Sequence, residues 1–326
     1  MADPPEVLVS TAAGIRTPEQ SLASLHEFPS GFRKVYLENL RLRRHVKLVE
    51  PDLVHLPAFA GAAVRAVPLL VTFHDVAFAA RPEWFSPSRR IYYRLRFRRT
   101  AMRADHLIAD SEFTAGELVS RMGVGASRIT VVYLSAEAGE DVTPLMFRRK
   151  RGIEGDYALF VGTIEPRKNL GTLLDAWDTL TRDGIRVTLV VSGRMGWEKK
   201  EIRDRLRRAR DVVWTGELSE EELASAYSGA KLLVYPSLYE GFGLPPLEAA
   251  CYGVPSVIGP AAALREVYGS VAAGIAGADA GSLAMEIARG LETHHSRRAI
   301  RDFARSFTHE RMASGVAGVY RRLSRR

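Results

Sequence analysis

The sequence predicts an α/β fold with two doubly wound parallel sheets, because short β-branched runs alternate with helical patterns along the chain. A length of 326 residues exceeds what one hydrophobic core usually fills, so we expect two domains. The alternation pauses over residues 136–156, which are polar, charged and include Pro144, and we interpret this stretch as the linker. The expected domains are 1–140 and 141–305, followed by a helix over 306–326 that packs back towards the first domain. Ligands of such folds bind beyond the carboxyl ends of the strands, which here predicts a site in the cleft between the domains.

The expected strands are short and rich in branched apolar residues. In the first half they are 6–10, 52–56, 69–73, 106–110 and 129–133, and in the second half 158–162, 187–192, 212–215, 232–235 and 255–258. The expected helices are 88–103, 111–122, 170–181, 199–208, 219–227 and 245–252. A last helix follows Thr308, a favoured N-cap residue, and carries arginines towards its end, where positive charge suits the helix dipole.

Composition excludes several classes of protein. No apolar run reaches the roughly 18 residues that a transmembrane helix needs, and the first residues have neither the basic nor the apolar region of a secretory signal, so we expect no such signal. The single cysteine, Cys251, excludes a disulfide within the chain and is typical of a reducing compartment. We therefore expect a cytoplasmic protein.

The charge balance favours an anionic partner. The net charge is +8 and the isoelectric point is near 9.7, which suits nucleic acid, an acidic membrane face or a phosphorylated ligand. A GC-rich genome that prefers arginine to lysine explains the excess equally well. No nucleic-acid-binding module is recognisable, so nucleic acid is not an expected partner.

The first of two strand-end motifs is G-T-I-E-P-R-K-N at 162–169. It directly follows an expected strand, begins with Gly162 and Thr163, and places Arg167 and Lys168 at the carboxyl edge of the sheet. Two adjacent cations suit a diphosphate whose charge grows as it leaves. Taken alone, the Arg-Lys pair is more typical of a solvated basic turn.

The second motif is S-L-Y-E-G-F-G-L-P-P-L-E-A at 237–249, after another expected strand. Gly241 and Gly243 permit close approach of the backbone to a ligand, and two prolines then begin a helix. A helix N-terminus with open amides is an anion site. Glu240 precedes the helix and faces the cleft, while Glu248 lies in its first turn and can accept hydrogen bonds from a vicinal diol such as ribose. The alternative is a generic dinucleotide loop, but the motif is not G-x-G-x-x-G and comes late in the chain.

In these motifs the chain resembles glycosyltransferase family 4. The resemblance rests on both strand-end motifs, including their E-x7-E spacing, together with V-T-F-H-D at 71–75 and D-S-E-F-T at 110–114. Their occurrence in this order is specific, whereas each motif alone is weak. The resemblance implies the GT-B architecture, in which two Rossmann-like domains face each other across a cleft.

The resemblance also implies roles for individual residues. Arg167 and Lys168 would hold the diphosphate of a nucleotide sugar, with Gly162 and Thr163 beside it, and Glu248 would bind the ribose. Glu240 would contact the transferred sugar. The four residues after Glu240 would approach the phosphate and sugar with their backbone amides. They are Gly241, Phe242, Gly243 and Leu244. His74 would face the reacting carbon, although a lone histidine at a strand end is as often structural. Neither a cofactor nor a metal is expected.

The implied reaction is retaining transfer of a hexose from a donor of the GDP-mannose or UDP-glucose type. The acceptor would be a glycan, a lipid-linked sugar or a small molecule. In the family picture the acceptor attacks on the face of the leaving diphosphate and gives it a proton, so catalysis is mostly positioning and electrostatics.

A basic segment in the first half, 89–99, interleaves arginines with Ile91, Leu95 and aromatic residues. As a helix it suits the acidic face of a membrane, which predicts a peripheral membrane contact. The alternative is an ordinary surface helix that covers the sheet.

One departure from the family pattern concerns the beginning of the first domain. Family members usually start with a strand and a glycine-rich loop, whereas residues 11–30 contain only Gly14. The first strand and loop are therefore expected to be missing or altered. This leaves a second function open, a non-catalytic member that binds nucleotide sugar as a scaffold or partner subunit.

Overall fold

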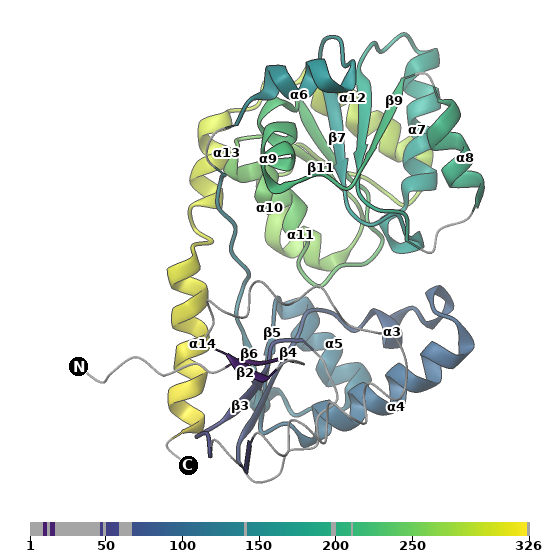
Figure 1. Ribbon diagram of the computed structural model, residues 1–326. Coiled ribbons are helices and arrows are strands. Elements are labelled where there is room, and N and C mark those ends of the chain that lie inside the picture. The colour runs from purple at the N-terminus through teal and green to yellow at the C-terminus, as the bar shows by residue number, and fades with distance from the viewer. Residues whose placement is uncertain are drawn as a thin grey trace.

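The computed structural model describes residues 9–11, 14–16, 46–47, 50–58, 67–139, 142–196, 200–209 and 211–324. Figure 1 shows two α/β domains, one above the other, each built on its own sheet, with the C-terminal helix running alongside the lower one. The larger sheet belongs to the second half of the chain and the smaller one to the first half.

The larger sheet positions the candidate site. Its strands are parallel in the order β12-β11-β10-β7-β8-β9. They span β7 (Tyr157–Val161), β8 (Thr188–Ser192), β9 (Val212–Gly216), β10 (Leu232–Tyr235), β11 (Ser256–Ile258) and β12 (Gly274–Ile275). The order reverses between β7 and β10, which pair directly. A ligand crevice is expected at the carboxyl ends of the strands at such a reversal.

Helices cover both faces of this sheet because successive strand residues point to opposite sides. Ala158 and Phe160 face one core, and Tyr157 and Leu159 face the other. The first core is closed by α7 (Leu170–Arg182), α8 (Lys200–Arg208) and α12 (Ala280–Glu292). The second is closed by α6 (Pro144–Arg151), α9 (Glu220–Gly229), α10 (Leu244–Cys251), α11 (Ala262–Tyr268) and α13 (Arg297–Ala304).

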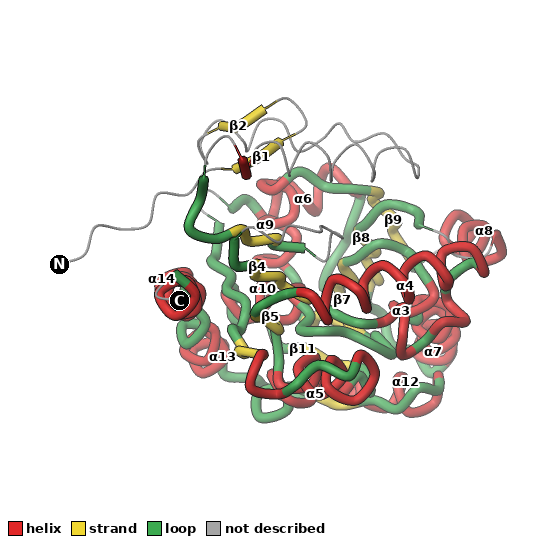
Figure 2. Tube along the Cα trace, turned by 90° about the horizontal axis from the view of Figure 1, so that it is seen from below, coloured by secondary structure: helices red, strands yellow, loops and turns green. Residues whose placement is uncertain are grey.

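The smaller sheet is parallel in the order β3-β4-β5-β6. Its strands are β3 (Val54–Leu56), β4 (Leu69–Phe73), β5 (His106–Ala109) and β6 (Ile129–Val131). One face packs on α3 (Ala77–Ala80), α4 (Pro87–Arg103) and α5 (Glu112–Met122), with Phe97 and Leu118 in the shared core. Figure 2 shows α4 and α5 on the same side of β4 and β5.

Helix α14 (His309–Leu323) covers the other face of the smaller sheet. Val319 and Leu323 pack on Leu70 and Ile108, and the Tyr320 hydroxyl lies 2.8 Å from His55 Nδ1. Thr308 caps the helix by accepting a hydrogen bond from the Arg311 amide at 3.2 Å. The chain therefore crosses between the sheets twice, once after β6 and once between α13 and α14.

The two crossings meet at one aromatic cluster, formed by Tyr133, Phe242 and Phe307. Tyr133 follows β6 and Phe307 precedes α14, and their ring centroids are 6.0 Å apart. Phe242, from the loop after β10, lies 6.1 Å from Tyr133 and 6.0 Å from Phe307. Both segments that cross between the domains thus pack against a residue of the second strand-end motif.

The doubly wound parallel architecture is confirmed, with differences in detail. Residues 136–156 are not a linker throughout, because α6 forms within them. Pro144 is well suited to the first turn of a helix, and Phe147 anchors that helix by packing on Tyr157. The structure adds elements that were not named from the sequence: strand β12, η2 (Pro82–Trp84), η3 (Ala126–Arg128), η4 (Pro166–Lys168) and helices α3, α11, α12 and α13.

The beginning of the chain also differs from expectation. The strand expected over 6–10 appears as β1 (Val9–Thr11), which pairs antiparallel with β2 (Gly14–Arg16) in a separate two-stranded sheet. Among the described residues, no strand before β3 joins the smaller sheet. The missing or altered glycine-rich loop was assigned to residues 11–30, of which only 11 and 14–16 are described, so that prediction lies outside the described structure.

Candidate active site at the domain interface

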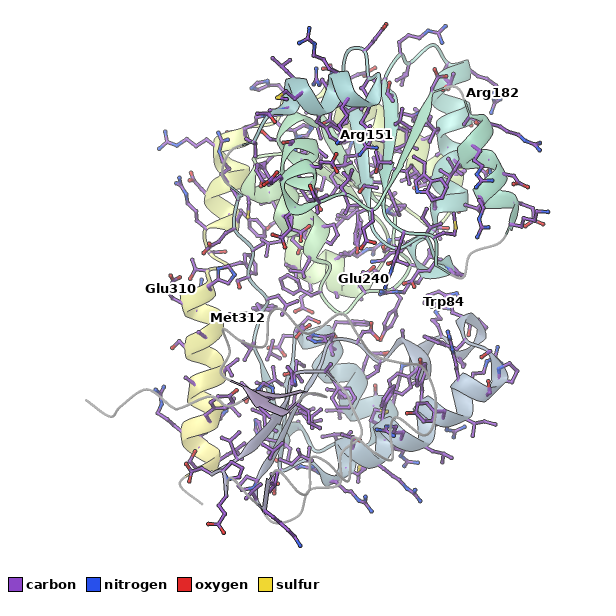
Figure 3. All side chains as sticks on the ribbon, viewed as in Figure 1. Trp84, Arg151, Arg182, Glu240, Glu310 and Met312 are labelled. Carbon is purple, nitrogen blue, oxygen red and sulfur yellow. The ribbon has the colours of Figure 1, made fainter. Side chains whose placement is uncertain are left out.

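The two strand-end motifs meet at the reversal point of the larger sheet. Residues 162–169 follow β7 and residues 236–243 follow β10, and the two strands are parallel neighbours. Figure 3 shows Glu240 at the junction of the two domains. The topology therefore brings together at one edge two segments that are about seventy residues apart in the sequence, and it turns them towards the smaller sheet.

Glu240 is the centre of a buried charge cluster with Arg167, Lys168 and Tyr235, which we call the switch-point cluster. Glu240 is buried, with only 5% of the residue exposed. Oε1 accepts hydrogen bonds from Lys168 Nζ at 2.6 Å and from the Tyr235 hydroxyl at 3.1 Å, while Oε2 accepts one from Arg167 at 3.1 Å. Lys168 also donates to the Tyr235 hydroxyl. Both carboxylate oxygens are thus bonded to cations.

The electrostatics of the switch-point cluster follow from its burial. Burial by itself would raise the pKa of Glu240, but the charges of Lys168 and Arg167 hold it below its usual range. The pKa of Lys168 is lowered, because burial and the neighbouring Arg167 outweigh the attraction of Glu240. Glu240 is therefore an ionised anchor rather than a proton donor.

Arg167 extends the cluster towards the N-terminal domain. Its guanidinium bonds Glu165, which is buried, and lies 3.8 Å from the carboxylate of Asp75 in the smaller domain. Burial opposes its charge, but Glu240, Glu165 and Asp75 together raise the pKa of Arg167. With its side chain 25% exposed, Arg167 is the cation of the cluster that a bound anion can reach.

The loop that follows Glu240 requires glycine at two positions. At Gly241 an added Cβ would lie 1.6 Å from the carbonyl oxygen of His74, so no side chain fits there. Gly243 has a φ of 90°, is the N-cap of α10, and its carbonyl accepts a hydrogen bond from Tyr268 at 2.6 Å. We call residues 240–243 the glycine loop. It runs directly over the end of strand β4.

Open amides surround the start of α10. Among the described residues, the amides of Phe242, Gly243 and Leu244 donate no hydrogen bond. Leu244 is the first residue of the helix, and the next two are prolines without an N–H. Unpaired amides at a helix N-terminus attract anions and hydroxyl oxygens.

Glu248 lies on α10 at the other end of this region. Because the helix begins one residue earlier than expected, Glu248 starts the second turn rather than belonging to the first. Its Oε2 accepts a hydrogen bond from the Tyr227 hydroxyl at 2.6 Å. Burial raises the pKa of Glu248, and the bond from Tyr227 offsets part of that effect. Its other carboxylate oxygen remains for a ligand.

His74 faces the site from the smaller sheet, at the carboxyl end of β4. Its Nδ1 lies 2.7 Å from Oδ2 of Asp110, which follows the neighbouring strand β5, and its side chain is 46% exposed. The hydrogen bond to Asp110 raises the pKa of His74, against the effect of burial. For Asp110, burial outweighs the attraction of His74 and raises the pKa. The imidazole is thus oriented by a buried carboxyl and keeps an accessible edge.

The structure brings most of the expected site residues together. His74 touches the glycine loop through its backbone, and the loop connects Glu240 with α10. Gly162 lies against the stem of Lys168, since a Cβ there would be 3.5 Å from Lys168 Cε. Thr163 is half-buried in the same turn. The side chain of Phe242 points into the aromatic cluster, so only its backbone can serve a ligand.

Sequence reasoning missed three residues that complete the site, namely Tyr235, Glu165 and Asp110. Each had a usable signal. Tyr235 is the last residue of β10, Glu165 lies inside the first motif, and Asp110 directly follows β5, the strand next to the one that His74 follows. Ends of parallel neighbours share an edge, so an Asp and a His at those ends are expected to meet. Within the described residues, no cluster of three or more His, Cys, Asp or Glu side chains could hold a metal ion.

Two family models cover most of the chain. The description of one is Glycosyltransferase Family 4, matching residues 6–135, and that of the other is Glycosyl transferases group 1, matching residues 146–307. The chain belongs to glycosyltransferase family 4. The resemblance drawn from the four motifs is thereby confirmed, and both domains contribute to it.

A family 4 relative is the O-antigen chain mannosyltransferase B of Escherichia coli, which is 32% identical over 210 residues. The alignment covers 61% of this chain and 55% of the relative, so the chain spans little more than half of that relative's length.

Solved structures show the same fold. The sucrose-phosphate synthase of Thermosynechococcus elongatus superposes with a TM-score of 0.75 at 18% identity, over 97% of this chain and 82% of that one. HepE of Anabaena, solved with UDP and glucose, superposes with a TM-score of 0.68 at 20% identity, over 91% and 84% of the two chains. The expected GT-B architecture is confirmed.

The buried pairing of Glu240 and Lys168 leads to a stability prediction. Glu240→Ala leaves a buried ammonium without its carboxylate, so we expect a loss of about 3–5 kcal/mol in the free energy of unfolding. Glu240→Leu combined with Lys168→Met removes both charges and should recover most of it. The measurement is urea unfolding followed by circular dichroism.

The control is Asp156→Ala, which breaks the exposed pair with Lys231 at 2.9 Å. An exposed pair contributes only about 0–1 kcal/mol. If Glu240→Ala were as stable as Asp156→Ala, Glu240 and Lys168 would not form a buried ion pair.

A second prediction concerns the titration of His74. Asp110→Asn removes the charge that favours the imidazolium, so the pKa of His74 should fall, which NMR of the ring Cε1 proton can follow. His55 is an internal reference, because burial and the charge of His74 lower its pKa to about 4 and keep it neutral near pH 7. An unchanged His74 pKa in the Asp110→Asn protein would contradict the pairing.

Proposed function

We propose that this family 4 protein is a retaining glycosyltransferase that moves a hexose from a nucleotide-diphosphate sugar to a glycan, lipid-linked or small-molecule acceptor. The observation that carries the proposal is the meeting of the switch-point cluster and the open amides of α10 with His74 of the other domain. The cations of one domain and an oriented histidine of the other thus lie on either side of the glycine loop. We further propose that residues 1–140 bind the acceptor and 141–305 the donor.

The proposed roles follow the chemistry of each group. Arg167, which is reachable by a ligand, and the buried Lys168 stabilise the diphosphate as negative charge develops on it. The free oxygen of Glu248 accepts from the ribose hydroxyls. The amides of Gly243 and Leu244 hydrogen-bond the phosphate and the sugar, and Glu240 holds both cations in register at the edge of the sugar site.

The proposed mechanism relies on positioning. Both oxygens of Glu240 are bonded to other groups, so this carboxylate is not a free nucleophile. Transfer with retention then proceeds on the face of the leaving diphosphate, which accepts the proton of the attacking hydroxyl. His74, oriented by Asp110, faces the reacting carbon and supports the charge that forms there.

The names of relatives support the choice of sugar. The Escherichia coli relative is a mannosyltransferase, and the Anabaena structure was solved with UDP and glucose. Mannose and glucose are therefore the donor sugars to test first, as GDP-mannose and UDP-glucose.

The test begins with nucleotide binding. A nucleoside diphosphate at a hundred times its Kd stabilises the folded state by about 2.7 kcal/mol, so a thermal-shift screen of UDP, GDP, ADP and dTDP identifies the base. Arg167→Gln should weaken that binding roughly 10- to 100-fold, as expected for lost charge-assisted hydrogen bonds. Arg186→Gln, an exposed arginine near the start of β8 at the opposite edge of the sheet, is the matched control.

Turnover of the matching nucleotide sugar with glycan and lipid extracts then decides between an enzyme and a binding subunit. Release of the nucleoside diphosphate with transfer of labelled hexose supports the proposal. Tight, Arg167-dependent nucleotide binding without turnover of any donor would instead favour the scaffold function.

We also propose that α4 contacts an acidic membrane. Its inner face covers the sheet through Phe97, Thr100 and Ala101, as one sequence alternative expected. Its outer face exposes Ile91, Leu95 and Met102, 64%, 59% and 49% accessible, which share one stripe of the helix. The helix contains no acidic residue, and its arginines are Arg89, Arg90, Arg94, Arg96, Arg98, Arg99 and Arg103. An apolar stripe among arginines suits a surface of anionic lipid.

The membrane proposal is tested with vesicles, because among the described residues no helix is long and apolar enough to cross a bilayer. The triple variant Arg94→Gln, Arg98→Gln, Arg99→Gln should bind phosphatidylglycerol-containing vesicles roughly 100-fold more weakly, at about 1 kcal/mol per arginine. Co-sedimentation measures it. The control replaces Arg298, Arg301 and Arg321, exposed on other helices, by Gln. Equal losses in both triple variants would mean that net charge, not α4, drives binding.

A further inference from the structure

The carboxyl end of strand β5 touches both halves of the site through two successive residues. Asp110 orients His74. Ser111, the next residue, donates a hydrogen bond from its hydroxyl to the carbonyl oxygen of Gly241 in the other domain, at 2.5 Å. Thr114, one helical turn further along α5, donates to the same carbonyl at 3.2 Å. Both side chains are buried. Because Ser111 and Thr114 lie in one domain and Gly241 in the other, these bonds exist only while the two domains are in contact.

The partner of these hydroxyls is the glycine loop, not an ordinary surface. Gly241 lies so close to the His74 carbonyl that any side chain would overlap it. Because a peptide unit is planar, holding the Gly241 carbonyl also sets the direction of the Phe242 N–H. The amides from Phe242 to Leu244 have no partner among the described residues. The orientation of these open amides therefore depends on contacts from the other domain.

The start of α5 is completed from the opposite domain as well. The first amides of a helix lack partners within it. At α5 the amides of Glu112 and Phe113 both donate to Glu266 of α11, at 2.8 Å each, while Ser111 caps Thr114 at 3.1 Å. Glu266 also accepts from the Tyr133 hydroxyl at 3.0 Å. The N-terminus of α5 thus binds the glycine loop and is itself capped in part by a side chain of the C-terminal domain.

We propose that Ser111 and Thr114 are positioning residues that align the glycine loop with His74 when the domains close, with Glu266 completing the closed contact. The inference rests on the proposed glycosyl transfer and adds to it the device that couples closure to the geometry of the donor site. In an open molecule the Gly241 carbonyl loses both hydroxyls, and the open amides lose their fixed direction. Nucleotide binding relies mainly on the side chains of Arg167 and Glu248, which lie in one domain, so it persists in that state although the amides near the phosphate are no longer aligned.

Four variants test the proposal. Thr114→Val removes one hydroxyl without changing the shape of the side chain, and Thr114→Ser keeps it. Ser111→Ala removes the other hydroxyl together with a helix cap. Ser219→Ala removes an equivalent cap from α9, where Ser219 accepts from the Glu222 amide at 3.2 Å, and serves as the matched control.

The expected result is a change in kcat with little change in nucleotide affinity. Thr114→Val and Ser111→Ala should lower kcat about tenfold or more, whereas the Kd of the nucleoside diphosphate that stabilises the wild type should change less than about threefold. Thr114→Ser and Ser219→Ala should keep the wild-type kcat. Wild-type kcat in both Thr114→Val and Ser111→Ala would overturn the proposal, as would equal losses in Ser111→Ala and Ser219→Ala.

Hydrogen exchange separates this proposal from the proposed function. In Thr114→Val and Ser111→Ala, and in Glu266→Ala, the amides of Glu112 and Phe113 should exchange faster than in the wild type, while Ser219→Ala leaves them unchanged. This readout needs no sugar donor. If no donor turns over, the transferase proposal fails on its own, and unchanged exchange in all three interface variants would then reject the coupling independently.

Discussion

The interaction on which the site depends is the bonding of one buried carboxylate, Glu240, to two cations at the reversal point of a parallel sheet. Lys168 and Arg167 lie beyond β7, and Glu240 lies beyond β10. A buried charge is stable only with close partners. The bonds of Glu240 to Lys168 and Arg167 therefore join the ends of two strands, keep Arg167 within 3.8 Å of Asp75 in the other domain, and hold the glycine loop where it meets that domain.

The interface between the domains has a polar part next to the site and an aromatic part next to the two segments that connect the domains. Hydroxyls of Ser111 and Thr114 and the carboxylate of Glu266 bind backbone groups, which fixes orientation as well as distance. The aromatic cluster of Tyr133, Phe242 and Phe307 packs where the chain crosses twice. Phe242 belongs both to this cluster and to the glycine loop, so a change in domain angle acts directly on the proposed donor site.

Much of the fold and part of the site could be predicted from the sequence. The strands at 69–73 and 232–235 were located without error, because a buried parallel strand is a short apolar run with clear ends. Helix α6 was missed because its charged sequence hides a single anchoring residue, Phe147. The pairing of Arg167 with three carboxylates was also missed. Glu165 is two residues before Arg167, but Asp75 and Glu240 come from distant segments, and only the fold brings them to the guanidinium.

The sequence by itself determined the alternation of strands and helices, the family and the residue types at each strand end, since these depend on local periodicity and on motifs of a few residues. Only the tertiary structure decided which of those ends meet. Glu240 was recognised at the start of a helix, but its burial against Lys168 follows from the pairing of β7 with β10. The sequence assigned no role to the D-S-E-F-T motif. In the structure it follows β5, which pairs with β4, and its Ser111 donates a hydrogen bond to Gly241 of the other domain. Contacts between segments 72 and 130 residues apart arise from packing, which local sequence does not encode.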